Sequence, residues 1–382
     1  LEHPRFHVGE SLLPATGPLL DKLGVRQAVE AIGMPKFGAE FVSPDHDHNS
    51  LLEFADAWDK SMPMAWQVRR SVFDEILFNN AAAKGARATQ NCRVTDVQFD
   101  AEGATAQALQ KDGTQRQIRA RFVLDASGRD TLLATKMGAK RKSEVHNTAA
   151  LFGHFRDAKR LPGKLEGNIT IFWFKHGWFW FIPLSDGTTS VGAVCWPYYL
   201  KTREKPLQAF FADTIAMCPH LAARLDGATL VDDAVHATGN YCYAATHASA
   251  ERYLLLGDAY AFVDPVFSSG VHLAMVSAFS AADTVAVCLD QPAKAAQARK
   301  AYDKLINLGP REFSWFIYRM MNPAMRDLFM YPANPWRVKE ALMSLLAGDI
   351  YGKTPIWWSL AMFKVIYRIS WLVHWRPNLK AL

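Results

Sequence analysis

The chain has 382 residues, of which 50% are hydrophobic and 21% are charged. This composition is that of a globular protein, and it excludes disordered, collagen-like and low-complexity classes. At about 150 residues per domain, the length predicts two or three domains or one large interleaved unit. The formal net charge of +6 is spread along the chain without a polybasic block, so we expect no nucleic-acid interface.

The five cysteines are odd in number and form no Cys-x-x-Cys pair, so they predict reduced thiols of a cytoplasmic protein. No cationic, apolar leader precedes the first predicted element, and we expect no secretion signal. The segment His46-Asp47-His48 is compatible with a metal site, but its polar surroundings favour a solvated loop. We therefore expect no bound metal.

Apolar spacing predicts helices over residues 12–32 and 68–85. Strands are predicted over 93–99 and 120–127, which flank a polar, glycine-containing stretch as hairpin strands do. From 151 to 238 the pattern predicts one antiparallel sheet, interrupted by a helix over 207–225. An apolar strand over 252–260 and a long helix over 270–289 follow, and beyond residue 296 the chain is predicted to be helical.

The strongest apolar segment, residues 356–375, is rich in tryptophan. Lys364 and Arg368 interrupt it well short of a membrane-spanning length, so we expect no transmembrane helix there. We favour a helix packed on the body of the protein. The alternative is a surface that docks on a membrane or on a partner protein.

Two polar turns at strand ends can seat a cofactor. Asp258 follows an apolar strand and precedes the helix predicted from residue 270. Its carboxylate can accept hydrogen bonds from ribityl hydroxyls, while a helix N-terminus favours negative charge, and together these features suit a flavin. The second turn carries Asp125, Ser127, Gly128 and Arg129. Either turn alone is also compatible with a simple turn or helix cap.

Together with the segment PRFHVGESLLP (4–14) and the run Gln67, Val68, Arg70, Phe73, Asp74, these turns resemble the FAD-dependent monooxygenase superfamily. The resemblance implies an α/β, GR2-type FAD-binding fold with an antiparallel substrate-side sheet and a helical C-terminal region. It implies an interleaved FAD-binding module over 1–150 and 239–295, a substrate sheet over 151–238 and a helical region over 296–382. The cofactor-binding residues that it implies are Gly9, Glu10, Ser11, Arg70, Asp125, Gly128, Gly257, Asp258 and Pro265, with His272 a further candidate contact. The family's first strand and GxGxxG turn have no match before Pro4, and we interpret this as an N-terminal segment that is either absent or not included in this sequence.

Two further motifs resemble the flavin-dependent halogenases within that superfamily. Residues 178–183 match WxWxIP, and residues 262–270 match FxxPxxSxG. The resemblance implies that Lys36 is the catalytic lysine, that Trp178 and Trp180 wall off the flavin, and that Ser269 and Gly270 bind halide. A period of two puts both indoles on one face of a strand, although such a strand can also be ordinary core.

By this resemblance, a separate reductase supplies FADH2, which reduces O2 to a flavin C4a-hydroperoxide. Chloride or bromide attacks it, and the resulting hypohalous acid passes to Lys36 and halogenates an electron-rich ring. No segment matches the one that carries the tryptophan-halogenase carboxylate, so we expect a phenol or pyrrole, free or tethered to an acyl or peptidyl carrier protein. The acidic surface of such a carrier would dock on the basic, aromatic C-terminal region. The alternatives are a non-halogenating FAD-dependent monooxygenase or reductase with an apolar substrate, and a non-catalytic binding protein.

Overall fold

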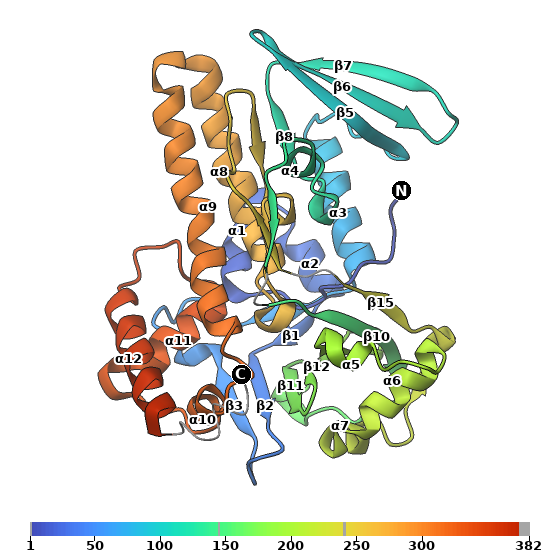
Figure 1. The fold of residues 1–382 in the computed structure, drawn as a ribbon, viewed down its shortest axis with the longest axis vertical. Helices are drawn as coiled ribbons and strands as arrows, with labels where there is room; N and C mark the ends of the chain where they lie inside the picture. Colours follow the sequence, from blue (N-terminus) through green and yellow to red (C-terminus); the bar gives the residue numbers. More distant parts are fainter. Residues whose placement is uncertain (1, 144–145, 240–241, 374–382) are drawn as a thin grey trace.

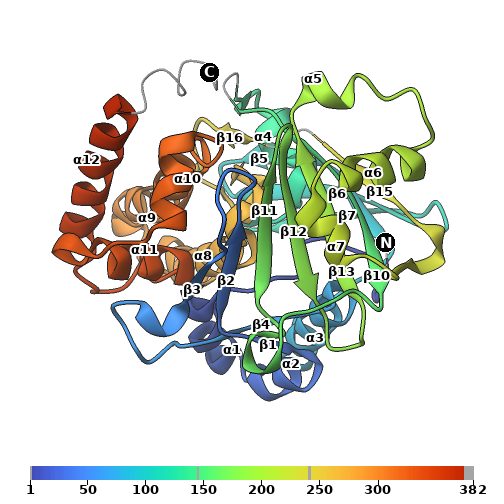
Figure 2. The same ribbon diagram turned by 90° about the horizontal axis from the view of Figure 1, so that it is seen from below.

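The computed structural model describes residues 2–143, 146–239 and 242–373 (Figure 1). A large sheet forms one end of the molecule and a small three-stranded sheet the other. The long helices α8 (Gly270–Asp290) and α9 (Ala295–Ile317) run side by side between them. The C-terminal helices lie beside the large sheet (Figure 2).

The large sheet has eight strands in the order β14-β10-β13-β12-β11-β2-β3, with β15 pairing on β10. Its strands are β2 (Gly38–Val42), β3 (Ser50–Glu53), β10 (Ala149–Arg156), β11 (Ile169–Phe174), β12 (Gly177–Pro183), β13 (Thr189–Cys195), β14 (Thr229–Leu230) and β15 (His236–Thr238). The predicted antiparallel pairing holds for β10 to β15. Among the described strands of this sheet, only β11 and β2 pair in parallel, so residues 38–53 extend the sheet.

Strands β11, β12 and β13 are buried along their whole length because helices cover both faces. On one face Phe179 and Phe181 pack with Phe210 of α6 (Leu207–Ala216). On the other face Trp178 and Trp180 join the core formed with the C-terminal helices. The prediction that these two indoles share a face of the strand is confirmed.

The remaining strands form four small sheets. The strands are β1 (Met34–Lys36) with β4 (Ala65–Gln67); β5 (Cys92–Asp100), β6 (Gly103–Gln110) and β7 (Gln115–Ala120); β8 (Val123–Asp125) with β17 (Tyr253–Leu255); and β9 (Lys140–Lys142), β16 (Tyr243–Ala245) and β18 (Ala261–Phe262). The predicted hairpin between residues 93–99 and 120–127 is wrong. Strand β5 pairs with β6, whereas β8 pairs in parallel with β17, about 130 residues away.

The helix predicted over residues 12–32 is also wrong as one element. It is divided into α1 (Gly17–Leu23) and α2 (Arg26–Ile32), because Gly24 adopts φ +74° and ends α1. The second predicted helix is α3 (Arg70–Ala83). The shorter helices are α4 (Leu132–Lys136), α5 (Pro197–Leu200) and α7 (Pro219–Arg224).

The region beyond residue 296 is helical, as predicted, as far as the structure describes it. It continues with α10 (Pro323–Met330), α11 (Val338–Ala347) and α12 (Trp357–Val373). Residues 374 and 375 of the predicted apolar segment lie outside the described residues. Of the helices described, α8 alone is long and apolar enough to cross a membrane by length and composition, and in this fold it packs against α9 and the Gly257–Ala259 turn.

Candidate active site

Lys36 lies at the end of β1 and is 2% exposed. Its Nζ donates hydrogen bonds to Ser11 Oγ at 2.9 Å and to the carbonyl oxygen of Leu12 at 3.2 Å, and it lies 5.1 Å from the centre of the Phe54 ring. Among the described residues no carboxylate pairs with it. Burial therefore lowers the pKa of Lys36 to about 7. A lysine in this state exchanges a proton near neutral pH and can act as a nucleophile.

The loop Gly9-Glu10-Ser11 connects Lys36 to the predicted flavin side. Ser11 bridges to Gln67 of β4, the strand that pairs with β1, which fixes its hydroxyl against Nζ. Gly9 adopts φ +99°, and the Arg70 guanidinium donates to the carbonyl oxygens of Val8 and Gly9 at 3.1 and 3.2 Å. Arg70 also forms a two-pronged bond with Asp74, so α3 holds the loop in place.

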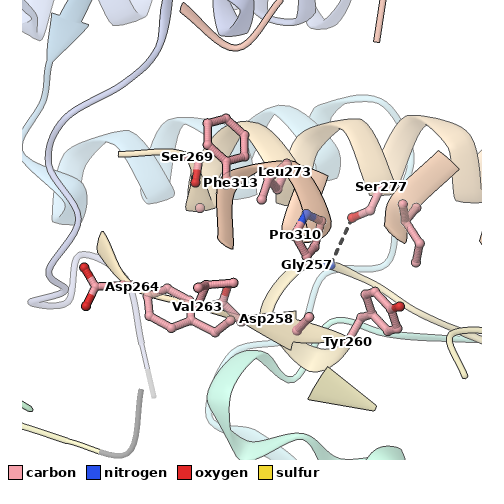
Figure 3. Close-up of a pocket in the computed structure, with 14 residues that line it drawn as sticks. Gly257, Asp258, Tyr260, Val263, Asp264, Ser269, Leu273, Ser277, Pro310 and Phe313 are labelled. Atoms are coloured by element: carbon pink, nitrogen blue, oxygen red, sulfur yellow. Dashed lines mark hydrogen bonds between the residues drawn. The ribbon is translucent and has the colours of Figure 1, made fainter. Parts of the chain in front are cut away.

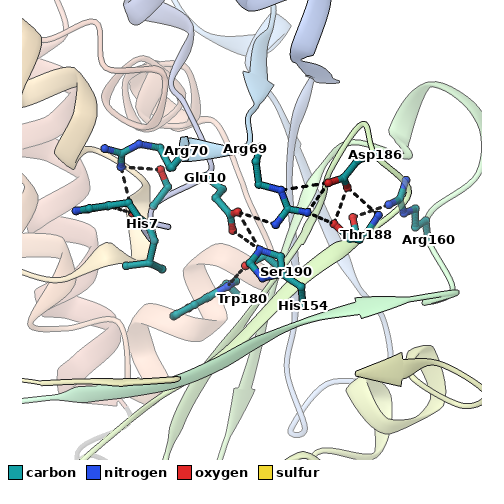
Figure 4. A network of polar contacts seen from close by, with 12 residues as sticks. His7, Glu10, Arg69, Arg70, His154, Arg160, Trp180, Asp186, Thr188 and Ser190 are labelled. Carbon is teal, nitrogen blue, oxygen red and sulfur yellow. Dashed lines mark hydrogen bonds and ion pairs between the residues drawn. The ribbon is translucent and has the colours of Figure 1, made fainter. Parts of the chain in front are cut away.

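Glu10 is 2% exposed and forms the centre of a buried polar network (Figure 4). His154 Nε2 on β10 lies 2.9 and 3.2 Å from its two oxygens, and Arg69 lies 3.8 Å away. Arg69 continues the network to Asp186 and Thr188 near the surface. Glu10 was predicted as a cofactor contact, and its carboxylate is here shared with His154 and Arg69.

Trp178 and Trp180 have ring centres 6.1 Å apart. The Trp180 indole donates to Ser190 Oγ at 3.1 Å and lies over Gly192, where a Cβ would be 2.2 Å from the ring. Glycine at position 192 therefore makes room for the indole. Trp178 lines an apolar hollow with Val194, Trp196 and Met320.

Asp258 lies in the turn after β17, at a small, partly open hollow of about 30 Å³ between this turn, α8 and α9 (Figure 3). Burial raises the pKa of Asp258 to about 6, although Arg70 and Arg129 oppose the rise. No described residue donates a hydrogen bond to its carboxylate, which leaves that group free for a ligand's hydroxyl. Gly257 adopts φ +50°, packs closely on Ala274, and donates to Ser277 Oγ at 2.9 Å.

The turn at Asp125 lies beside the Asp258 turn, because the Leu256 amide donates to the Asp125 carbonyl oxygen at 2.9 Å. The Asp125 carboxylate, however, accepts from the backbone amides of Ser127 and Leu133 at 2.9 and 2.8 Å. Both oxygens are thus used within the turn, where Gly128 takes φ +61°. In this structure Asp125 shapes the turn, and its predicted contact with the cofactor remains a prediction.

The predicted halide loop begins at Pro265 and ends at the start of α8. Ser269 precedes that helix, its side chain makes no cap bond, and both Ser269 and Gly270 line the Asp258 hollow. His272, in the first turn of α8, is 3% exposed. Neither of its ring nitrogens has a hydrogen-bond partner among the described residues, and burial lowers its pKa to about 4.

Sequence reasoning missed several residues around this site. Asp264 accepts from Thr148 at 3.1 Å and lies 3.0 Å from His146 Nε2, and its other oxygen accepts from the Val266 amide, which fixes the halide loop to the segment that leads into β10. His154 and Phe54 were missed as well. Glu10 stands before an apolar segment, which indicates that its carboxylate needs a buried partner. That partner, His154, lies 144 residues further along the chain, so local sequence does not identify it. Among the described residues no cluster of three or more metal-ligating side chains occurs.

A family model for tryptophan halogenases matches residues 48–327. The chain belongs to the flavin-dependent halogenase family. It is 32% identical to the flavin-dependent halogenase armH4 of Armillaria mellea, over 81% of this chain and 64% of that protein. It is 28% identical to the 1H-pyrrole-2-carbonyl-[peptidyl-carrier protein] chlorinase of Pseudomonas fluorescens, over 91% of this chain and 82% of that one. The chain thus spans less than two thirds of the first of these relatives.

Solved structures agree with the assignment of the fold. A flavoprotein/dehydrogenase from Cytophaga hutchinsonii aligns with TM-score 0.87 and 28% identity, over 98% of this chain and 91% of that one. The myxobacterial chondrochloren halogenase CndH aligns with TM-score 0.80 and 30% identity, over 99% and 91%. The predicted FAD-binding α/β fold with a helical C-terminal region is confirmed.

Flavin-dependent halogenases use FAD, and the residues present fit that cofactor. The unbonded Asp258 carboxylate suits a ribityl hydroxyl, and Arg70 and Arg129 provide positive charge nearby. A Cβ at position 257 would lie 2.8 Å from the Ala274 side chain, so only glycine allows this turn to pack against α8 and leave its backbone accessible to a ligand.

Proposed function

We propose that this protein is an FADH2-dependent halogenase that forms a carbon–halogen bond on an electron-rich aromatic ring, a phenol or a pyrrole. Membership of the family supports the reaction type. The observation that carries the proposal is the buried Lys36, whose pKa is lowered to about 7. A lysine at the surface would keep its charge and contact solvent, whereas burial gives this one a substantial neutral fraction near pH 7.

The chemistry at Lys36 follows from its protonation state. The neutral amine displaces hydroxide from hypohalous acid, which gives an N-halamine and water. The ring then takes the halogen and loses a proton, which restores the amine. Ser11 Oγ and the Leu12 carbonyl oxygen accept from Nζ and orient its lone pair. A phenol or pyrrole is rich enough in electrons to react without a carboxylate base.

When bound, FADH2 supplies the two electrons that, with O2 and a proton, convert halide into hypohalous acid. We propose that Asp258, Arg70 and the Gly9 loop hold this cofactor and that Ser269 and Gly270 hold chloride or bromide. Trp178 and Trp180 then exclude the aromatic substrate from the flavin. Because the scheme consumes FADH2, a separate flavin reductase must regenerate it.

A substrate tethered to a carrier protein is the second part of the proposal. One relative is named as a chlorinase of a pyrrole carried on a peptidyl carrier protein. A covalent tether would deliver a small ring at high effective concentration. Comparing the free acid with its carrier thioester tests this part separately.

The decisive experiment supplies the protein with FADH2, air, bromide or chloride, and a panel of phenols and pyrroles, and detects products by mass. We expect halogenated product from the wild type and none from Lys36→Met, which keeps the buried volume but removes the amine. Lys36→Arg should also fail, because a guanidinium remains protonated. FAD affinity and oxygen consumption should persist in both variants.

Lys164→Met is the matched control, because this exposed lysine lies over Phe37, next in sequence to Lys36. It should halogenate at the wild-type rate. Hydroxylated product without halogenated product would instead support the monooxygenase alternative, and failure to bind FAD would support a non-catalytic binding protein.

A further inference from the structure

Helix α12 has two different apolar faces. Its inner face packs on the body through Leu360, Phe363 and Tyr367, which are buried. A helix turns about 100° per residue, which places four residues within about 60° of the direction opposite to the inner face. They are Trp358, Val365, Ile369 and Leu372. Their exposed fractions are 61, 41, 58 and 65%. We call these four residues the outer stripe.

The outer stripe lies at the edge of the molecule. In Figure 2, α12 is the outermost helix, with α10 and α11 on its inner side. The predicted packing of this helix on the body of the protein is confirmed, but it involves only the inner face of the helix. Four large apolar side chains in one row on a free helix face are uncommon on a protein that has no further contact there.

The chain segment that carries the stripe is rich in basic residues. From Ile350 to residue 382 the sequence contains five Lys or Arg and no Asp or Glu. Lys364 is neutralised by Glu312 at 2.9 Å, but Arg368 lies exposed at the side of the stripe, and Lys353 lies exposed before the helix. The free cations near the stripe thus have no acidic counterpart within this segment.

This charge pattern selects among possible occupants. In a symmetric contact with a second copy, the same patch meets itself, so two basic surfaces would face each other. An acidic protein would require a denser set of free cations than these two. An apolar row with few flanking cations and tryptophan at one end suits the boundary of a bilayer that contains anionic lipid.

We propose that the outer stripe of α12 docks this protein on an anionic membrane surface, with the helix lying flat in the interface. The inner face stays packed on α10 and α11, so docking needs no unfolding. This inference does not depend on the halogenation chemistry, because it rests on exposure and charge at a separate surface.

The test measures cosedimentation of the full protein with vesicles of phosphatidylcholine alone or with one quarter phosphatidylglycerol. We expect binding to the anionic vesicles and less binding at higher salt. Ile369→Ser/Leu372→Ser should lower the partition coefficient about tenfold or more, since both side chains would insert. Arg368→Gln should lower it about fivefold at low salt.

The matched controls lie in the three-stranded sheet at the other end of the molecule. Leu109→Ser/Ile118→Ser removes the same two side-chain types from partly exposed positions, and Arg116→Gln removes one exposed charge. Both should bind vesicles as the wild type does, and circular dichroism should show all variants folded.

Three results would overturn the proposal. The first is no binding to anionic vesicles, and the second is equal loss of binding in the control variants. The third is self-association, or binding to an acidic carrier protein, that the α12 variants abolish while vesicles bind none of the proteins.

Discussion

At the scale of single residues, burial favours the uncharged form of two groups with opposite charges. Lys36 is buried and Asp258 is half-buried, and neither has a fully matched partner, so the pKa of the lysine falls to about 7 and that of the aspartate rises to about 6. Both groups therefore titrate close to neutral pH. The same physical cause makes one a nucleophile and the other a pH-dependent acceptor.

Halogenation should rise with pH through about 7 under saturating FADH2 and halide. The pKa of Lys36 is lowered, so the ammonium predominates below this pH and the reactive neutral amine above it. The measurement is the rate of aryl halide formation from pH 5.5 to 8.5 with a substrate that does not titrate in that range. A rate that falls as pH rises through 7 would show that the ammonium is the active form.

Asp258→Asn should weaken FAD binding about tenfold to a hundredfold, because a hydrogen bond to a charged acceptor contributes about 1.5 to 3 kcal/mol. Since the pKa of Asp258 is raised, wild-type affinity should also fall as pH drops below about 6. Titration by fluorescence at pH 5 and 7.5 measures both effects.

In the Asn variant the pH dependence should disappear. Asp130→Asn, in the neighbouring turn, is the control and should bind FAD normally. Unchanged affinity in Asp258→Asn would remove this residue from the cofactor site.

At the scale of elements, β12 shows how one strand supplies two cores. Its alternate residues face different layers, so Phe179 and Phe181 pack toward α6 while the two indoles face the C-terminal helices. The two indoles form the proposed wall between flavin and substrate. Packing is not its sole support, because the Trp180 indole donates a hydrogen bond to Ser190 and lies against Gly192. Its position is therefore fixed rather than adaptable.

Trp180→Phe should lower aryl halogenation several-fold and leave oxygen consumption by added FADH2 unchanged. The smaller ring loses the bond to Ser190 and opens the wall. The comparison is Trp173→Phe on β11, which also loses one indole bond, to the Met320 carbonyl oxygen, but lies outside the proposed wall. If both variants lose halogenation equally, the effect is general loss of packing.

At the scale of the whole molecule, a buried ion pair joins the N-terminal strands to the helices on the far face of the sheet. Glu40 of β2 accepts from Arg224 of α7 at 2.6 Å, and Thr170 of β11 and Asn49 complete its hydrogen bonds. Arg224 also stacks over Phe172 and Phe181. Three segments far apart in the chain thus depend on one carboxylate.

Arg224→Met should destabilise the protein by about 3 kcal/mol, because it leaves Glu40 buried without its cation. Lys159→Met is the control, since it breaks the exposed pair with Asp226 and should cost less than about 1 kcal/mol. Chemical denaturation of both variants measures the difference. Equal stabilities would mean that Glu40 is satisfied by Thr170 and Asn49 alone.

The sequence by itself determined the features that depend on local periodicity. The shared face of Trp178 and Trp180 follows from the period of a strand, and the helix from Gly270 follows from its long, largely apolar pattern without proline. The motifs around these residues were sufficient to predict the family and its fold.

Only the tertiary structure showed which distant segments contact one another and how those contacts change the side chains. The burial that lowers the pKa of Lys36, the contact of Glu10 with His154, and the parallel pairing of β8 with β17 all join residues far apart in sequence. Local patterns set the direction of a side chain along its own element but not the group that it meets across the core. For that reason the sequence indicated the lysine, and only the fold showed that it is buried and that its pKa is lowered to about 7.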